Sequence, residues 1–417
     1  MNLMSLVRRS LRQHALSSFV TIVSVGLAAG LTMAVFAINA QTYDAFTGGK
    51  VGFDAVLGAR GSQLQLVLNT VFHLETSPGN IPWSLYKEIS EDPRVTLAIP
   101  YAVGDNYQGY RIVGTTQEMF TKFTYREGQG FVLKTGGRVF DESKKEAILG
   151  HYVADKLGLA VGSTFTPYHG LQFSEREKHQ DEYTVVAVME PTNGPSDRVL
   201  WIPIEGIYRM SGHVLRGGGK PIRATPGEVI AEEHLEVSAV MLKLRNPQAG
   251  FLLNQQINQV GKVATFAWPI GRVMAELFDR IGWVSRILTM VAYLIVVVAA
   301  GSILASIYNT MNERRREFAI LRALGARRAT VFSAIVLEAS TITTIGALLG
   351  FLVYGGILAA AFVIVRAQTG VVLDAFKFDP ALWMTPVGMI VLGALAGLVP
   401  AFKAYRTDVA SNLTPLS

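Results

Sequence analysis

Four long apolar runs limit the folds that this 417-residue chain can adopt. They cover residues 19–40, 284–308, 331–365 and 381–401. Each reaches the roughly twenty residues that a helix needs to span a hydrocarbon core of about 30 Å. The long segment between the first two runs contains no such stretch and mixes short β-rich segments with helical ones,. The sequence therefore predicts a membrane protein with four transmembrane α-helices and a large α+β domain between spans 1 and 2.

The positions of arginine and lysine indicate which ends face the cytoplasm. Residues 1–16 place three arginines opposite an apolar side, a pattern typical of a helix lying on an anionic membrane surface,. Arginines gather again between the second and third runs, and Lys403 and Arg406 follow the fourth. Because positive residues stay on the cytoplasmic side, both termini are expected there. The α+β domain is then extracytoplasmic, in a protein of the bacterial inner (cytoplasmic) membrane.

The first apolar run also allows a second interpretation, a cleaved signal peptide. The sequence Ala37-Ile38-Asn39-Ala40 is similar to a small-residue cleavage site,. The run is longer than the roughly 7–15 apolar residues of a signal core, so we expect an uncleaved span.

These patterns divide the chain into nine segments. They are a cytoplasmic amphipathic helix (1–16), the first span (17–40), the extracytoplasmic α+β domain (41–269), a stalk with the second span (270–310), a cytoplasmic helix (311–328), the third span (329–365), an extracytoplasmic loop (366–380), the fourth span (381–403) and a cytoplasmic tail (404–417). The apolar spacing of Val273, Leu277 and Ile281 predicts that stalk and second span form one long helix,.

Within the outer domain, short patterns predict individual elements. Strands are expected at 110–113, 184–188, 200–202 and 237–244, and helices at 61–72, 82–89, 147–157 and 248–261,. The glycine- and proline-rich residues 216–227 predict a flexible loop,.

The segment from Met311 to Phe332 carries six arginines against two glutamates between two membrane spans. Phe318, Leu321 and Leu324 recur at helical spacing, and Gly325 is placed to end the helix,. A basic amphipathic helix here can lie on lipid headgroups or be bound by a soluble partner.

The order of residues in this segment resembles the signature of the MacB/FtsX/LolC-like permeases of ABC transporters. It carries Arg316-Glu317 followed by Ile320-Leu-Arg-Ala-Leu-Gly-Ala326. Further fragments that resemble this family stand in its usual order at 111–116, 137–140, 146–150, 157–162, 183–191, 197–203 and 400–410. The resemblance thus covers nearly the whole chain.

The resemblance implies a permease subunit of the mechanotransmission type, whose cytoplasmic coupling helix sits in a groove of the ATPase. On this chain the expected ATPase-coupling residues are Arg314, Arg316, Glu317, Ile320, Leu321, Arg322, Leu324 and Gly325. It also implies that the outer domain has a porter-like part near the membrane (41–109 and 236–269) and an inserted distal part (110–235). A second permease subunit, identical or a paralogue, is expected, with a periplasmic adaptor or a lipoprotein as a further candidate partner.

The implied function is transmission of ATP-driven motion to the periplasmic domain, for export or extraction of a lipoprotein or an amphiphile. Two alternatives remain. One is an ATPase-linked signalling subunit that controls a cell-wall hydrolase, and the other is a membrane-anchored sensor that works without ATP.

No catalytic motif is recognisable on the chain. It lacks the GxxxxGK[ST] phosphate loop, so ATP and Mg are expected on a partner ATPase, with no cofactor on this chain and no nucleic-acid partner,. It also lacks cysteine, which excludes disulfides and thiolate metal sites,. The outer-domain histidines show no ligand spacing, so no metal site is expected among His73, His151, His169, His179, His213 and His234,.

Polar and small residues inside the apolar runs are also candidates for function. Glu338 lies within the third run, where an ionisable group costs a few kcal/mol and is by default functional or paired,. A proton relay is one interpretation, and a structural or conformational role is the favoured one because no second buried charge is evident. The pairs Gly346/Gly350 and Gly393/Gly397 predict close helix packing, within one subunit or between two,.

Overall fold

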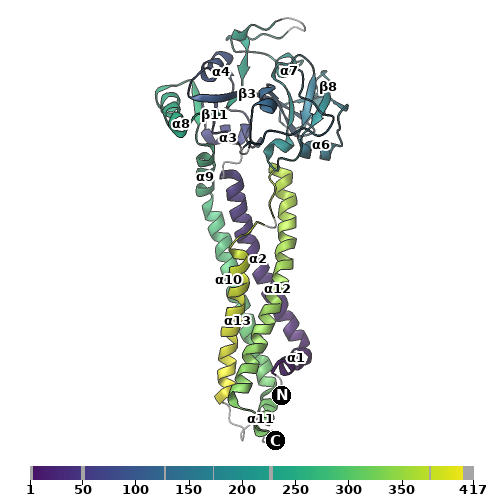
Figure 1. Cartoon of the computed structure of the whole chain (residues 1–417), viewed down its shortest axis with the longest axis vertical. Helices are drawn as coiled ribbons and strands as arrows, with labels where there is room; N and C mark the ends of the chain where they lie inside the picture. Colours follow the sequence, from purple (N-terminus) through teal and green to yellow (C-terminus); the bar gives the residue numbers. More distant parts are fainter. Residues whose placement is uncertain are drawn as a thin grey trace. The chain divides into compact units, whose positions relative to one another are not determined.

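The computed structural model describes residues 3–47, 52–125, 128–171, 173–224, 229–374 and 377–406. Two compact units make up the chain (Figure 1). The helical unit comprises Met1–Thr42, Ile281–Val363 and Leu373–Ser417, and the sheet unit comprises Tyr43–Arg280 with Ile364–Val372.

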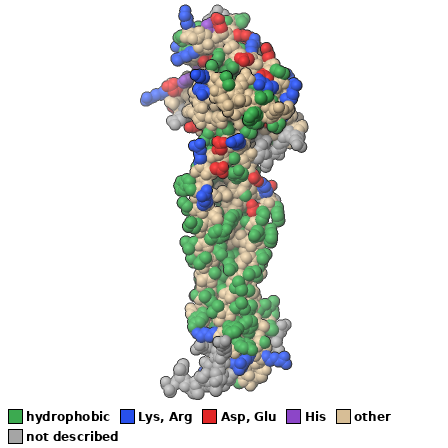
Figure 2. Space-filling view, turned by 90° about the vertical axis from the view of Figure 1, so that its left-hand side faces the viewer, with side chains coloured by type: hydrophobic (Ala, Val, Ile, Leu, Met, Phe, Trp, Pro, Cys, Tyr) green, Lys and Arg blue, Asp and Glu red, His purple; other side chains and the backbone are tan. Residues whose placement is uncertain are grey.

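Among the described residues, the helical unit contains four helices long and apolar enough to cross a membrane. They are α2 (Ala15–Thr47), α10 (Gly282–Glu313), α12 (Arg328–Thr369) and α13 (Ala381–Arg406). Two shorter helices accompany them, α1 (Leu3–Gln13) and α11 (Arg315–Ala323). Hydrophobic side chains cover the middle of this unit and basic ones gather near one end (Figure 2). Such a surface suits contact with lipid, and the predicted four spans are confirmed as helices.

The sheet unit is built on one large mixed sheet. In spatial order its main path is β12 (Ala264–Ala267), β1 (Ala55–Ala59), β11 (Ala239–Leu244), β3 (Val95–Tyr107), β4 (Tyr110–Thr115), β9 (Leu200–Pro203), β5 (Glu146–Leu149), β8 (Tyr183–Val188) and β6 (Thr164–Phe165). A further strand, β7 (Tyr168–His169), pairs with β3, while β2 (Ile81–Pro82) and β10 (Glu236–Val237) form a separate pair.

The helices of this unit are short. They are α3 (Gln63–Thr70), α4 (Trp83–Ser90), α5 (Glu118–Thr121), α6 (His151–Leu157), α7 (Ile204–Arg209), α8 (Pro247–Asn254) and α9 (Ile270–Arg280). A single π-helical turn, Gln255–Val260, follows α8.

Both faces of the large sheet are buried. Val56 and Leu57 are adjacent on β1 but belong to different hydrophobic clusters. Ile112 and Val113, adjacent on β4, are divided between the same two clusters. Neighbouring residues of a strand point to opposite faces, so each face has its own cluster. The outer domain therefore has two hydrophobic cores separated by the sheet.

The strand β3 joins the two halves of this sheet. Its first part pairs with β11 from Val95 to Tyr101, and its second part pairs with β4 from Ala102 to Tyr107. One continuous strand therefore belongs to both halves of the sheet, and it ends at Tyr107, before residue 110, where the inserted distal part is predicted to begin.

Two predicted elements differ from the structure. The helix expected at 147–157 begins only at His151, because Glu146–Leu149 forms β5, whose burial on both faces removes the alternation typical of strands,. The long helix expected from the stalk into the second span is divided, since Ile281 lies in a turn between α9 and α10 (φ −92°, ψ 4°). Glycine at the next position is a poor helix former. Of the predicted loop 216–227, residues 225–227 lie outside the described residues, as do 407–417 of the predicted tail.

Candidate functional site

Helix α11 forms the predicted amphipathic segment between two spans. It ends at Ala323 and is followed at Gly325 by a φ of +97°, which lies in the left-handed region that glycine favours. The Gly325 amide donates to the Arg322 carbonyl and the Ala326 amide donates to the Leu321 carbonyl, both at 3.0 Å. These two hydrogen bonds form a Schellman motif, which satisfies carbonyls of the last turn and stops the helix.

The surface of α11 divides into a buried and an exposed side. Phe318 and Ala319 are buried in the helical unit. Ile320 and Leu324 are 44% and 81% exposed, and Arg316 is exposed as well. Exposed apolar side chains beside an arginine form a surface suited to a protein partner. We call Arg316, Ile320 and Leu324 the docking surface.

The other predicted coupling residues contribute less to this surface. Leu321 and Arg322 are half-buried, and Gly325 acts through the backbone. Glu317 is half-buried and accepts hydrogen bonds from Arg314 Nε at 3.1 Å and from Gln13 Nε2 of α1 at 3.3 Å. Glu317 therefore ties α11 to neighbouring helices.

Arg314 departs from its predicted role. The residue is only 6% exposed, and its Nη1 lies 3.1 Å from Glu338 Oε2. Its guanidinium carbon also lies 4.9 Å from the centre of the Phe318 ring. A side chain held in this way does not offer its charge to a partner. Arg314 is therefore an internal residue that fixes the start of α11, and the prediction of ATPase contact is corrected for it.

The same contact corrects the description of Glu338 as a carboxylate without a second buried charge. Glu338 is 8% exposed and accepts hydrogen bonds from Arg314 and from the hydroxyl of Ser10 on α1. Arg314 also donates to Ser10. This buried triad of Ser10, Arg314 and Glu338 joins α1, the start of α11 and α12. A paired glutamate favours the structural role over a proton relay.

The glycine pairs lie where helices of this chain approach one another. A Cβ placed on Gly346 would lie 2.7 Å from Val25 Cβ of α2, and one on Gly350 would lie 2.8 Å from Ala29 Cβ. Cβ atoms on Gly393 and Gly397 of α13 would meet Thr343 Cγ2 at 2.2 Å and Ala339 Cβ at 2.8 Å, both on α12. Both pairs therefore serve packing within the subunit.

A matching glycine pair in the first span was missed from the sequence. Cβ atoms on Gly26 and Gly30 of α2 would lie 2.9 Å from Leu349 and 2.5 Å from Val353 of α12. Their four-residue spacing was the available signal.

A second missed feature lies in the outer domain, where four ligand-type side chains meet. Asp105 on β3, His169 on β7, His179 after the short helix Glu175–Glu177, and His213 after α7 place one ligand atom each within 4.8 Å of one another. We call these four residues the histidine cluster. They come from four separate segments that only the fold brings together, so no spacing along the chain could reveal them.

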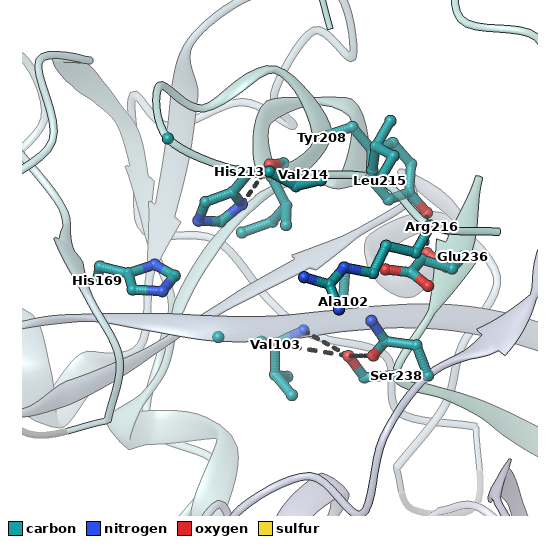
Figure 3. Close-up of a pocket in the computed structure, with 14 residues that line it drawn as sticks. Ala102, Val103, His169, Tyr208, His213, Val214, Leu215, Arg216, Glu236 and Ser238 are labelled. Atoms are coloured by element: carbon teal, nitrogen blue, oxygen red, sulfur yellow. Dashed lines mark hydrogen bonds between the residues drawn. The ribbon is translucent and has the colours of Figure 1, made fainter. Parts of the chain in front are cut away.

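A single oxygen, Asp105 Oδ1, lies at the centre of this cluster. It is 3.2 Å from His169 Nδ1, from His179 Nε2 and from His213 Nε2. The other ring nitrogens of His179 and His213 lie 2.7 Å and 2.8 Å from the carbonyls of Ser211 and Ile207. His169 and His213 also line a cavity of about 330 Å³ and stand on the same side of it (Figure 3).

The clustered side chains shift one another's pKa. Burial by itself raises the pKa of the Asp105 carboxyl, but hydrogen bonds with the three histidines outweigh burial and hold that pKa below its usual range. The hydrogen bond with Asp105 raises the pKa of His169 above its ordinary value. Burial lowers the pKa of His179, yet the contact with Asp105 makes the net shift upward. Each shift favours positive charge around a buried carboxylate.

Two protein-family models match this chain and together cover most of it. The MacB-like periplasmic core domain matches residues 18–260, and the FtsX-like permease C-terminal domain matches residues 289–409. The first match covers most of the outer domain, up to residue 260, and the second includes α11 and the last two spans.

Curated relatives of the chain are export proteins that combine ATP-binding and permease parts by name. The pyoverdine export ATP-binding/permease protein PvdT of Pseudomonas fluorescens is 26% identical over 66% of this chain and 38% of its own length. The macrolide export ATP-binding/permease protein MacB of Burkholderia thailandensis is 22% identical over 45% of this chain and 28% of its own length. The chain thus spans less than half the length of these relatives.

Among solved structures, the periplasmic region of MacB from Actinobacillus actinomycetemcomitans aligns with a TM-score of 0.33 and 12% identity, over 55% of this chain and 94% of that one. The family matches, in contrast, cover both the outer domain and the membrane spans. The chain is a multi-pass membrane protein that belongs to the MacB/FtsX-like family of ABC transporter permeases.

Proposed function

We propose that this chain is the permease subunit to which a cytoplasmic ATPase, carried on a separate polypeptide, binds through α11. The observation that carries the proposal is the docking surface, where Arg316, Ile320 and Leu324 stay exposed on a short helix between two spans. Burial of two apolar side chains beside an arginine supplies the kind of central contact that dominates protein interfaces.

The buried triad supports transmission of movement from this surface. Arg314 stands at the junction of α10 and α11 and pairs with Glu338 on α12. Ser10 adds α1 to the same group. Separating a buried ion pair is costly because it leaves an unpaired buried charge. Helix α11 therefore cannot move independently of the neighbouring helices. A displacement of α11 is therefore passed to the spans.

The proposed task is export or extraction of a lipoprotein or an amphiphile, with ATP-driven motion transmitted to the periplasmic domain. The names of the relatives, which export a macrolide or pyoverdine, support this class of task. We place the chain in the bacterial inner membrane, with both termini in the cytoplasm and a second permease subunit beside it. ATP and Mg then bind to the partner ATPase.

The test is co-purification of the tagged chain from its native membrane in mild detergent. The natural chain should bring an ATPase subunit in equal amount. The double variant Arg316→Ala/Leu324→Ser should lose at least about tenfold of that ATPase and of the stimulated ATP turnover, since contacts of this kind are commonly worth more than 1.4 kcal/mol. Both residues are exposed, so membrane insertion should be unchanged.

Arg9→Ala is the matched control, because Arg9 is an exposed arginine on α1 outside the docking surface. It should retain the ATPase. Equal ATPase recovery with the natural chain and the double variant would refute docking on α11. The strain used should make an ABC ATPase whose gene lies beside the gene of this chain. Recovery of the chain without that ATPase would instead favour the ATP-independent sensor.

A further inference from the structure

We propose that the histidine cluster of Asp105, His169, His179 and His213 binds one divalent transition-metal ion of the zinc type. The site lies in the outer domain and is independent of the docking surface.

The protons on two of the rings are fixed by backbone carbonyls. A carbonyl oxygen can only accept, so His179 Nδ1 donates to Ser211 and His213 Nδ1 donates to Ile207,. In a neutral imidazole the remaining nitrogen, Nε2, then carries a lone pair. In both residues this Nε2 lies 3.2 Å from Asp105 Oδ1, which also presents lone pairs. Two acceptors facing each other repel, so a proton or a metal ion is required between them.

Protons alone supply that cation poorly. His169 can donate to Asp105 from Nδ1 as a neutral ring, but His179 and His213 would each need a second proton and would both become imidazolium. The centres of these two rings are only 5.2 Å apart, so their positive charges would repel each other,. One divalent ion places two positive charges among neutral rings and removes this repulsion.

The separations between Asp105 Oδ1 and the three ring nitrogens suit a tetrahedral ion. Zinc binds histidine nitrogen and carboxylate oxygen at about 2.0–2.2 Å, so neighbouring ligand atoms of a tetrahedral site are about 3.3–3.5 Å apart. The three separations from Asp105 Oδ1 are 3.2 Å each. The hydrogen bonds from Nδ1 to backbone carbonyls are the arrangement by which metal-binding histidines are commonly oriented. Three imidazoles and one carboxylate are also ligands that zinc prefers.

Burial supports the same conclusion. The Asp105 side chain is 0% exposed, and its second oxygen, Oδ2, accepts no hydrogen bond from the residues that the structure describes. An ionised carboxylate with an unsatisfied oxygen is costly to bury unless a strong cation is bound to it. His169 is the accessible member, with a side chain 55% exposed, so an ion can enter from the surface.

Four protein ligands complete the coordination of zinc, which is typical of structural sites. The ion would join β3, β7, the segment after Glu175–Glu177 and the turn after α7. We therefore assign to it a stabilising role in the outer domain. No disulfide can take this role, because the chain contains no cysteine.

The test measures zinc binding by the full-length chain in detergent, purified with a tag that contains no histidine and then stripped of metal. Titration with ZnCl₂ against a coloured zinc indicator should show one tight site per chain. CoCl₂ should give the visible absorption of tetrahedral cobalt. Zinc should also raise the midpoint of thermal unfolding.

His179→Gln and His213→Gln should each lower the zinc affinity by more than the roughly 10–100-fold that loss of an outer hydrogen bond costs a metal site. His234→Gln is the matched control, since His234 lies in the same domain outside the cluster and contacts Glu233 at 3.5 Å. It should keep the affinity of the natural chain.

Two results would overturn the proposal. The first is a natural chain that leaves all zinc on the indicator and gives no tetrahedral cobalt spectrum, which would mean that the cluster is held by protons. The second is zinc binding of equal affinity in the natural chain and in His179→Gln, which would place the ion elsewhere. Because the first result depends on the natural chain alone, misfolding of a variant cannot obscure it.

Discussion

Arg314 and Glu338 show how one ion pair can set the position of a functional helix. Both are almost fully buried, and their charged atoms are 3.1 Å apart. The pair lies where α10 ends and α11 begins, with Ser10 as a third member. A charge that is removed from water at this place is tolerated only while its partner remains. We therefore propose that Arg314 and Glu338 hold α11 in place, and that Arg316 and Leu324 present the docking surface.

We expect Glu338→Ala to destabilise the chain by about 3–5 kcal/mol, because it leaves the Arg314 charge buried and unpaired. The double variant Arg314→Met/Glu338→Met removes both charges and should recover most of that loss. Thermal unfolding in detergent measures both effects. The loss of stability in the double variant is compared with the sum of the losses in Arg314→Met and in Glu338→Met. If the two were equal, the residues would not act as a pair.

Sequence analysis identified Glu338 but not its partner. An acidic residue inside an apolar run is conspicuous, whereas Arg314 is one of several arginines in a basic segment. Which of them turns inward depends on the residue at which α10 stops, and helix ends are the least certain feature of a pattern. The histidine cluster was missed for a related reason, since Asp105 and His169 become neighbours only through the pairing of β3 with β7.

At the scale of elements, the spans α2 and α12 pack with their backbones close together. Gly26 and Gly30 of α2 lie against α12, and Gly346 and Gly350 of α12 lie against α2. Small residues on both helices allow this approach, which gains van der Waals contact where lipid gives no hydrophobic driving force. The packing of α2 against α12 thus depends on the close fit of their small residues.

Gly346→Val should weaken this packing by about 1–3 kcal/mol, since its side chain would overlap Val25. Gly356→Val is the control on the same helix, because a Cβ there meets nothing within 4 Å. Thermal unfolding in detergent should give a clearly lower midpoint for Gly346→Val than for Gly356→Val. Equal loss in both would show that helix propensity, and not contact with α2, decides the effect.

Two of the glycine pairs, the membrane spans and the strands β4, β8, β9 and β11 could be predicted from the sequence because each depends on local pattern. β5 could not, since a short strand buried on both faces has no alternation and adjoins a true helix at His151,. The turn at Ile281 was also missed, because the apolar spacing of α9 continues into α10 without a clear break.

At the scale of the whole molecule, the chain is expected to expose the sheet unit outside the cell and α11 inside. A chain without cysteine makes this measurable, because an introduced cysteine is the only thiol. Val161→Cys, at an exposed position of the outer domain, should react with a membrane-impermeant maleimide in intact spheroplasts. Ala329→Cys, exposed at the start of α12, should react only after permeabilisation. The reverse labelling pattern would show that the topology is opposite to the one expected.

The single strand β3 has a mechanical consequence for such a protein. It pairs with β11 along one part of its length and with β4 along the next, so a pull on one half of the outer domain reaches the other through the strand itself. Force directed along a strand loads its rows of hydrogen bonds in shear, and many bonds must then fail together. Force across the strand would open them one after another. The outer domain should therefore resist extension along β3, so a pull in that direction would be transmitted with little stretching of the domain.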